Sequence, residues 1–276
     1  MNLTYKYLKK KYLSFFDYDI EYLNFVVTDA LFGYSQISKY LKDKKIKRVC
    51  EVGSGTGILL NELQNKYPKK KFVGIDPGES GYHNYRDTLT KIGKKNKNIS
   101  FIKKNITSLN TPKKFDLIFS INVFEHVKDQ KKYINKTLSM LNKNGKIVIF
   151  SPNYDFPYEP HFVIPIIINK KITEFFFKDY LIRHEKKTKE IGLWKGLNIS
   201  GKREIEKFLL KKKLKYFFDK SIKDQMFERV TKDKIFEKRQ GLAAKLTKIF
   251  RFFFLDKLIF DILKIPFPYM ELVIKK

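Results

Sequence analysis

Cysteine is nearly absent from this chain of 276 residues, and Cys50 is the single example. One cysteine excludes a disulfide within the chain, so we expect a protein of a reducing compartment. Cys50 lies in a short apolar run, which favours a buried, inert thiol over a nucleophile. The first residues lack the apolar core of a signal peptide. We therefore expect a cytoplasmic location.

Long apolar runs are missing as well. The longest, at 162–168, is interrupted by Pro165 and is much shorter than the ~20 residues of a membrane span. Apolar residues nevertheless make up 43% of the chain, which excludes global disorder. The length suffices for one large domain, or for one domain and a cap.

Arginine and acidic residues are scarce beside lysine. The chain has 58 basic and 29 acidic residues, for a net charge of +29, yet only seven of the basic residues are arginines. Such a charge favours anionic partners, namely nucleic acid, a phospholipid surface or a phosphorylated substrate. Recognition of bases and phosphates favours the planar fork of arginine. We therefore do not expect nucleic acid to be the partner.

Three glycines at alternate positions mark the stretch that organises the chain. Residues 48–52 form an apolar run, Gly53, Gly55 and Gly57 follow, and a helix-compatible segment begins at Ile58. This order predicts a buried strand, a tight turn and a helix. Glycines without a Cβ let a ligand approach the backbone, and the N–H groups at a helix start attract polar or anionic atoms.

A second signal lies downstream at Asp76, which ends the apolar run 71–76. A carboxylate at the end of a second parallel strand can bind ribose hydroxyls beside a glycine loop. Both dehydrogenases and methyltransferases use such an acid, so Asp76 alone does not choose between them. The dinucleotide fingerprint has a third glycine where this chain has Ile58, which argues against an NAD-dependent oxidoreductase.

Strands and helices alternate through the middle of the chain. Strands are predicted near 47–52, 71–76, 99–104, 115–121 and 146–151, and helices near 57–66, 80–93 and 129–142. This alternation predicts an α/β fold with a doubly wound, mostly parallel sheet, whose ligands bind at the carboxyl ends of the strands.

Four ordered motifs make the chain similar to the class I S-adenosylmethionine-dependent methyltransferases. They are the Glu-x-Gly-x-Gly-x-Gly loop from Glu51, the strand that ends in Asp76, the segment 115–127 with its Glu-His-Val ending, and the helix-turn-strand 141–150. The resemblance covers about residues 46–152. A sixth strand is predicted near 214–222. The resemblance implies a seven-stranded sheet whose last strand, near 269–274, is antiparallel and lies between strands five and six.

The resemblance also implies S-adenosylmethionine as the cofactor and assigns roles around it. Glu51 would support the loop and the amino end of the ligand, and Asp76 would bind both ribose hydroxyls. Asn105 stands where the family usually has an aspartate that contacts adenine, and its amide oxygen can still accept a hydrogen bond. The full set of expected cofactor residues is Glu51, Gly53, Ser54, Gly55, Gly57, Asp76, Asn105, Ile106, Ser120 and Asn122.

Four segments are predicted from the changes of pattern. They are a helical N-terminal segment at 1–45, which is a lid or a helix packed on the sheet edge, the core at 46–152, an inserted aromatic cap at 153–199, and the C-terminal part of the fold at 200–276. Ser200 is the predicted N-cap of the helix that follows it. Residues 226–264 read as helical, basic and aromatic.

His126 and His161 are the candidate catalytic residues, because histidine titrates near neutrality and can serve as a general base. Each could instead make a structural hydrogen bond, and Glu159 or Tyr158 would be the alternative base. No cluster has the sequence spacing of a metal site, so we predict none.

We therefore expect a methyltransferase that methylates an oxygen of a small molecule or of a sugar- or lipid-linked envelope precursor. The alternatives are an RNA methyltransferase, an NAD-dependent oxidoreductase and a non-catalytic cofactor-binding partner protein. Residues 245–264 place apolar and basic side chains on one helix. Either this helix is buried on two sides, or it lies peripherally on an anionic membrane at its inner face.

Overall fold

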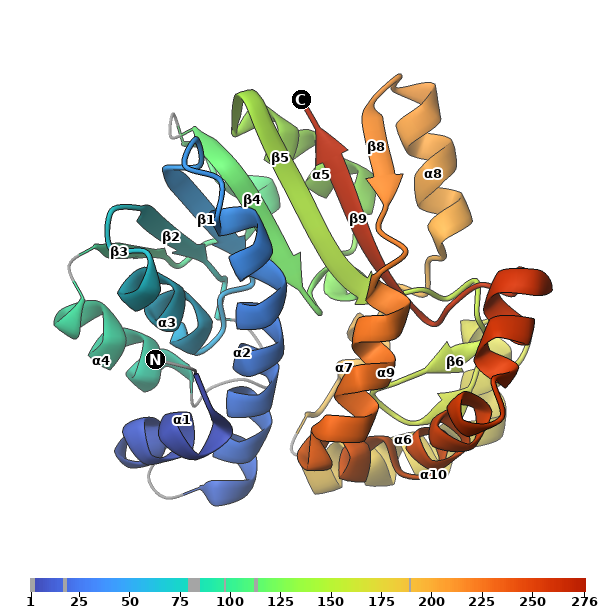
Figure 1. Cartoon of the computed structure of the whole chain (residues 1–276). Coiled ribbons are helices and arrows are strands. Elements are labelled where there is room, and N and C mark those ends of the chain that lie inside the picture. Colours follow the sequence, from blue (N-terminus) through green and yellow to red (C-terminus); the bar gives the residue numbers. More distant parts are fainter. Residues whose placement is uncertain (1–2, 17–18, 79–84, 97, 112–113, 189) are drawn as a thin grey trace. The chain divides into compact units, whose positions relative to one another are not determined.

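The computed structural model of the chain describes residues 3–16, 19–78, 85–96, 98–111, 114–188 and 190–276. These residues form two compact units (Figure 1). The first comprises 1–121, 131–148 and 275–276, and the second comprises 122–130 and 149–274. The boundaries of the units fall within the predicted core segment, at the ends of its fourth and fifth strands.

The main sheet has seven strands in the order β3-β2-β1-β4-β5-β9-β8, as the resemblance implies. The strands are β1 (Arg48–Val52), β2 (Lys71–Ile75), β3 (Ile99–Ile102), β4 (Phe115–Ile121), β5 (Leu141–Pro152), β8 (Lys215–Phe218) and β9 (Tyr269–Lys275). Parallel pairs join β1 to β2, β1 to β4 and β2 to β3. These strands are mainly apolar, because helices cover a parallel sheet on both faces.

The last strand, β9, lies between β5 and β8. Its arrow points opposite to theirs in Figure 1, so the predicted antiparallel insertion is confirmed. Six of its seven residues are buried, which explains why this short tail is strongly apolar despite its lysine-rich flanks. Expected and observed strands differ mainly at their ends, since β3 stops at Ile102 and β5 begins at Leu141.

Four helices belong to the first unit before the fourth strand. They are α1 (Tyr5–Tyr12), α2 (Ile20–Leu41), α3 (Ile58–Lys66) and α4 (Tyr85–Lys95), with short turns η1 (Leu13–Phe15) and η2 (Ile106–Ser108). The predicted helix 80–93 begins in part outside the described residues. A further helix, α5 (Gln130–Ser139), precedes β5.

The N-terminal helix α1 is held on α3, the helix that follows the glycine loop. The hydroxyl of Tyr12 donates to the buried carboxylate of Glu62, and Lys11 Nζ lies 2.6 Å from the same oxygen. Helices α1 and α2 also pack on one another. The N-terminal segment therefore packs on helices of the first unit, and α2 also meets the sheet, since Gly33 lies against the side chain of Ile121 in β4. Its role as a lid stays a prediction.

The aromatic segment after β5 forms part of the second unit. It contains a small hairpin of β6 (Tyr158–Glu159) and β7 (Ile164–Pro165), then α6 (Lys170–Thr188) and α7 (Leu193–Gly196). Phe162, Leu181 and Trp194 bury one another in a hydrophobic cluster. The structure thus shows the satellite cluster that the aromatic composition of this segment suggests.

The helix α8 (Lys202–Lys211) begins one residue later than the sequence indicates, with Gly201 as N-cap. Its first amides are bound by side chains from the segment after β5: Lys202 N–H donates to Asn153 and Arg203 N–H to Asp155, each at 2.9 Å. The hydroxyl of Ser200 instead donates to Asn198. The N-cap prediction for Ser200 is therefore wrong, because distant side chains satisfy the helix start.

The region 226–264, which the sequence predicts to be helical, consists of several elements. It comprises α9 (Ile222–Lys232), α10 (Lys234–Phe252) and a π-helical turn η4 (Lys257–Ile262). Gly241 has φ 51° and ψ −119° inside α10, and a kink of this kind suits glycine, which has no Cβ to clash. Asp233 caps α10 by accepting from the amides of Ile235 and Phe236.

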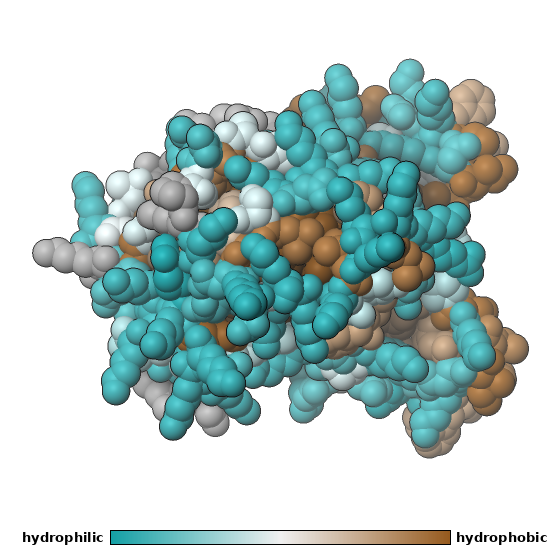
Figure 2. All heavy atoms as spheres, turned by 90° about the horizontal axis from the view of Figure 1, so that it is seen from above, coloured by the Kyte–Doolittle hydropathy of each residue, from teal (hydrophilic) through white to brown (hydrophobic). Residues whose placement is uncertain are grey.

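From residue 242 onward, α10 and the two residues that follow it carry exposed apolar side chains. At helical spacing, Leu242, Leu246 and Ile249 are 69%, 44% and 49% exposed, and Phe252, Phe253 and Phe254 follow at 76%, 63% and 67%. We call these six side chains the α10 apolar face. The expectation of a helix buried on two sides is therefore wrong. Figure 2 shows one side of the molecule, where hydrophilic side chains prevail and apolar groups reach the surface in separate patches.

Candidate functional site

The glycine loop connects β1 to α3 and has the backbone that its sequence predicts. Gly53, Gly55 and Gly57 have φ angles of 76°, 46° and 75°, in the left-handed region that side chains with a Cβ disfavour. Gly53 N–H donates to the carbonyl of Ile75 at 2.7 Å, which ties the loop to the end of β2. The loop therefore lies at the carboxyl ends of β1 and β2, the edge where ligands of such sheets bind.

Two of these glycines meet different surroundings. A Cβ on Gly57 would lie 2.8 Å from the ring of Phe101, so this position is fixed by packing. A Cβ on Gly55 would meet no heavy atom of the described residues within 4 Å. Gly55 thus presents bare backbone to open space, as a loop that follows a ligand must do.

Asp76 follows β2 and binds the loop directly. Its carboxylate accepts from Gly55 N–H at 2.9 Å and from Gly78 N–H at 2.8 Å. The structure confirms that the acid and the glycine loop, which are 21 positions apart, meet. A carboxylate held by two amides keeps lone pairs free for hydroxyl donors, which is the chemistry expected of it.

Glu51 and Ser54 lie buried beneath the loop. Glu51 is 5% exposed, and its Oε2 has no hydrogen-bond partner among the described residues. Burial, reinforced by the neighbouring charge of Asp76, raises the pKa of Glu51 well above its usual value. Ser54 Oγ is likewise buried and unpartnered in the described part of the chain. A cationic group at the loop would favour ionisation of Glu51.

The remaining cofactor candidates of the first unit are placed less favourably. Asn105 follows the end of β3 by three residues, and its Oδ1 accepts from both the N–H and the hydroxyl of Thr107, so this oxygen caps η2. Ile106 is buried, and Ser120 is fully buried within β4. The roles of these three at a ligand stay predictions.

Asn122 belongs to the second unit and follows β4 immediately. Its φ is 53°, a left-handed conformation that asparagine tolerates better than most residues. Its Oδ1 accepts from the hydroxyl of Tyr269 at 2.7 Å. The side chain is therefore held by β9, and its contact with a ligand also stays a prediction.

The two histidines singled out from the sequence lie together in the second unit. His126 ends the turn η3 (Phe124–His126), and His161 lies in the hairpin loop after β6. Their ring centroids are 5.3 Å apart. Glu125 Oε1 lies 3.9 Å from His161 Nε2, so an acid and two imidazoles share one place.

Hydrogen bonds from neighbouring groups fix the side chains of this cluster. Glu159 Oε1 lies 2.6 Å from His161 Nδ1, and Glu159 Oε2 accepts from Phe162 N–H at 2.7 Å. Glu125 Oε2 accepts from the hydroxyl of Ser151 at 3.1 Å, whereas its Oε1 is buried without a partner in the described residues. We call Glu125, His126, His161 and Glu159 the acid–imidazole cluster.

The cluster distributes its charge unevenly. Burial raises the pKa of Glu125 to about 7, although His161 offsets part of the rise. Burial lowers the pKa of His126 to about 3, so this imidazole is neutral. Burial would also lower the pKa of His161, but the carboxylate of Glu159 outweighs it and raises the value to about 9. Glu159 and His161 therefore form an ion pair beside an acid that titrates near neutrality.

Sequence reasoning missed the part that Glu125 plays. The sequence analysis used Glu125 only as part of the Glu-His-Val motif and predicted no role for its side chain, which is 1% exposed and faces His161. It also predicted no metal site, whereas ligand atoms of Glu125, His126 and His161 all lie within 4.8 Å of one another. Thirty-five positions in the sequence separate His126 from His161. No local spacing rule could have found the group.

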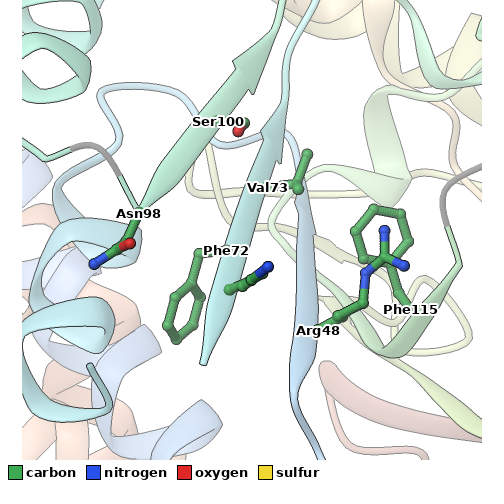
Figure 3. A pocket seen from close by; sticks show the side chains of 7 residues that line it. Arg48, Phe72, Val73, Asn98, Ser100 and Phe115 are labelled. Carbon is green, nitrogen blue, oxygen red and sulfur yellow. The ribbon is translucent and has the colours of Figure 1, made fainter. Parts of the chain in front are cut away.

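A hollow lies at the opposite ends of the strands of the first unit (Figure 3). It is lined by Arg48, Lys71, Phe72, Val73, Asn98, Ser100 and Phe115. Arg48 extends over the ring of Phe115, 5.7 Å from its centroid. This hollow is at the amino ends of β1 and β2, away from the glycine loop, and it contains no acid or histidine among its lining residues. We therefore place the functional site at the other edge.

Comparison with known proteins identifies the family of the chain. A family described as a methyltransferase domain matches residues 43–221. Malonyl-[acyl-carrier protein] O-methyltransferase 1 of Ilyobacter polytropus is 30% identical over 124 residues, which are 42% of this chain and 45% of that protein. The chain spans about half the length of the first curated relatives it matches.

Two solved structures show the same fold at low identity. One is the plantazolicin methyltransferase BpumL in complex with a pentazolic desmethylPZN analogue and SAH, with a TM-score of 0.53 and 15% identity over 99% of this chain and 98% of that one. The other is a Haemonchus contortus phosphoethanolamine N-methyltransferase, with a TM-score of 0.55 and 14% identity over 88% of this chain and 52% of that one.

The family match covers well over half of the chain and includes the glycine loop, Asp76 and the acid–imidazole cluster. The seven-stranded sheet and its antiparallel insertion agree with it. The chain therefore belongs to the methyltransferase-domain family, the class I S-adenosylmethionine-dependent methyltransferases that its motifs resemble.

Proposed function

We propose that this chain transfers the methyl group of S-adenosylmethionine to a hydroxyl oxygen of a small molecule or of a sugar- or lipid-linked envelope precursor. The observation that carries the choice of oxygen is the acid–imidazole cluster. Methyl transfer from a sulfonium needs a base only when the acceptor keeps its proton at neutral pH, as an alcohol does.

The first unit would bind the cofactor. The open backbone at Gly55 lets the ligand approach, and Asp76 would accept from the two ribose hydroxyls. Glu51 would ionise against the ammonium of the methionine part, which supplies the charge that the empty loop lacks. Ser54 would donate to the same end of the ligand. Asn105, Ile106, Ser120 and Asn122 complete the proposed set.

The second unit would act on the acceptor. In the reaction the acceptor oxygen forms a bond to the methyl carbon while the carbon–sulfur bond breaks, and S-adenosylhomocysteine leaves. The hydroxyl proton passes to Glu125, the member of the acid–imidazole cluster whose pKa lies near neutrality, while Glu159 fixes the orientation of His161 beside it. His126 and His161 are thus the proposed catalytic residues, together with Glu125. Holding the two reactants in line would supply most of the remaining rate.

The relatives are consistent with more than one acceptor atom. The Ilyobacter polytropus relative is named as an O-methyltransferase of malonyl-[acyl-carrier protein], and the Haemonchus contortus structure as an N-methyltransferase. The choice of oxygen therefore rests on the cluster. The family match removes the oxidoreductase alternative. An RNA acceptor and a non-catalytic partner protein are outcomes that the experiment below can return.

We further propose peripheral contact with the inner face of an anionic membrane through the α10 apolar face. Lys245, Lys257 and Lys264 are exposed near it, and the chain as a whole carries a charge of +29. Lysines that reach phosphates beside phenylalanines in the acyl boundary are typical of interfacial helices. In the described ranges, no helix has the length and apolar composition needed to cross a bilayer.

The test is an acceptor screen with S-adenosylmethionine labelled in its methyl group. Purified protein is incubated with polar, lipid and RNA extracts, and labelled products are identified by mass spectrometry. We expect label on an oxygen of a polar or lipid-linked product. Label on nitrogen would overturn the choice of acceptor atom, label in ribonuclease-sensitive material would favour the RNA alternative, and binding of S-adenosylhomocysteine without any transfer would favour the non-catalytic one.

A further inference from the structure

The acid–imidazole cluster has a property that a proton acceptor alone does not require. Glu125, His126 and His161 each offer a ligand atom, and the three atoms lie within 4.8 Å of one another. Two nitrogens and one carboxylate oxygen are the donor set of His₂Glu catalytic zinc sites. Ligands about 2.1 Å from a tetrahedral ion are about 3.4 Å apart, so an inward movement of about 1 Å would complete the group.

An independent observation points to a missing cation. Glu125 Oε1 is buried, with the residue 1% exposed, and it has no hydrogen-bond partner among the residues that the structure describes. It faces His161 Nε2 at 3.9 Å, beyond hydrogen-bond distance. A buried carboxylate oxygen without a partner is costly. A cation between these two atoms would satisfy both.

The surrounding contacts are those that orient metal ligands. A metal-binding histidine usually donates its second ring N–H to a carboxylate, which fixes the ring and its tautomer. Glu159 takes this place on His161 Nδ1 at 2.6 Å and is itself held by Phe162 N–H. Ser151 holds the second oxygen of Glu125 at 3.1 Å. In His161 and Glu125, one polar atom is thus hydrogen-bonded to a neighbouring residue, and the other, Nε2 or Oε1, faces the proposed metal position.

We propose that Glu125, His126 and His161 bind one divalent first-row transition-metal ion of the zinc class, with an open position for an acceptor oxygen. Two imidazoles favour zinc or cobalt over magnesium, which prefers oxygen ligands. The proposal rests on the proposed function for its purpose, because a bound cation stabilises the alkoxide character of a hydroxyl acceptor.

The experiment uses the full-length chain without an affinity tag, stripped with a chelator and titrated with Co²⁺ alone. We expect one Co²⁺ per chain and the visible ligand-field absorption of nitrogen-ligated cobalt, and Zn²⁺ should displace it. His161→Ala and Glu125→Gln should abolish the band. Glu174→Gln is the control, since this carboxylate is exposed on α6 and lies outside the group of ligand atoms, and it should leave the band unchanged.

A substitution behind the site keeps the test decisive if a ligand variant fails to fold. Glu159→Gln retains the shape of the side chain and should weaken Co²⁺ binding by about 10- to 100-fold, as outer-shell substitutions do. Absence of a one-to-one cobalt complex in the wild type, or an unchanged complex in His161→Ala, would overturn the proposal. Methyl transfer to oxygen that persists in excess chelator would refute the metal and leave the proposed function standing. A cobalt complex without methyl transfer to any hydroxyl would support the metal site and refute the proposed O-methyltransferase function.

Discussion

The α10 apolar face offers the sharpest physical test of membrane contact, through Phe252→Ser. Phe252 is 76% exposed. A phenylalanine buries roughly 200 Å² when enclosed, so about 150 Å² of this side chain faces solvent. At ~25 cal/mol per Å² its complete transfer from water is worth about 3.8 kcal/mol, and insertion to half its depth about 2 kcal/mol. The substitution should therefore weaken vesicle binding about thirtyfold.

Sedimentation with phosphatidylglycerol vesicles at low salt measures this effect, with neutral phosphatidylcholine vesicles as the lipid control. Leu210→Ser is the matched protein control, because Leu210 is a 61% exposed apolar side chain on α8, remote in sequence from the face. Replacing both Lys245 and Lys257 with glutamine should cost about 1 kcal/mol for each charge at low salt and little at high salt.

The membrane proposal fails if the wild type stays in the supernatant with both lipids. It also fails if Leu210→Ser weakens binding as much as Phe252→Ser does, because the binding would then follow general hydrophobicity and not this face. A loss of binding in high salt combined with no effect of Phe252→Ser would indicate electrostatic adsorption without insertion.

Four further predictions concern the two units. Gly55→Ala should weaken S-adenosylhomocysteine binding at least tenfold in calorimetry. The control is Gly192→Ala, which also replaces a glycine of positive φ that has no neighbour within 4 Å among the described residues. Both variants should lose about 1 kcal/mol of stability, and equal affinities of the two for the ligand would contradict the proposed role of Gly55. Because the pKa of Glu51 is raised and a cationic ligand would favour its ionised form, cofactor binding should release a proton; calorimetry in buffers of different ionisation enthalpy measures this release, and Glu51→Gln should reduce it. Tyr12→Phe should lower the unfolding free energy in urea by about 1.5–3 kcal/mol through loss of its bond to the buried Glu62, with Tyr7→Phe as the control; similar midpoints would refute the anchoring of α1. His161→Ala should keep cofactor affinity and lose turnover by a factor of about 10² to 10⁴, while His184→Ala retains it; full activity would remove His161 from the mechanism.

The core of the fold was readable because its signals are local. Apolar runs, alternate glycines and the acid after β2 follow one another along the chain, and each fixes an element without knowledge of its neighbours. The order of the strands beyond β5, including the antiparallel β9, came only through family resemblance. No periodicity in 269–275 could have indicated which strands it would join.

The candidate site likewise has one part that local sequence signals predict and one part that depends on tertiary packing. Gly55 and Asp76 were predicted as partners, since parallel strands bring their carboxyl ends together. The grouping of Glu125 with His161 depends on the hairpin of β6 and β7, whose position depends on tertiary packing. The kink at Gly241 and the exposure of Phe252 were likewise beyond a helical wheel, which shows that a helix has an apolar face and not what covers it.

The two carboxylates at the glycine loop have a consequence for turnover. Asp76 and Glu51 would contact the ribose and the ammonium, and these groups are the same in S-adenosylmethionine and S-adenosylhomocysteine. Interactions made equally with reactant and product lower both dissociation constants and do not speed the chemical step. The spent cofactor should therefore be a strong competitive inhibitor. The rate in a cell would then depend on how fast a hydrolase of S-adenosylhomocysteine, or another process that consumes it, clears this product.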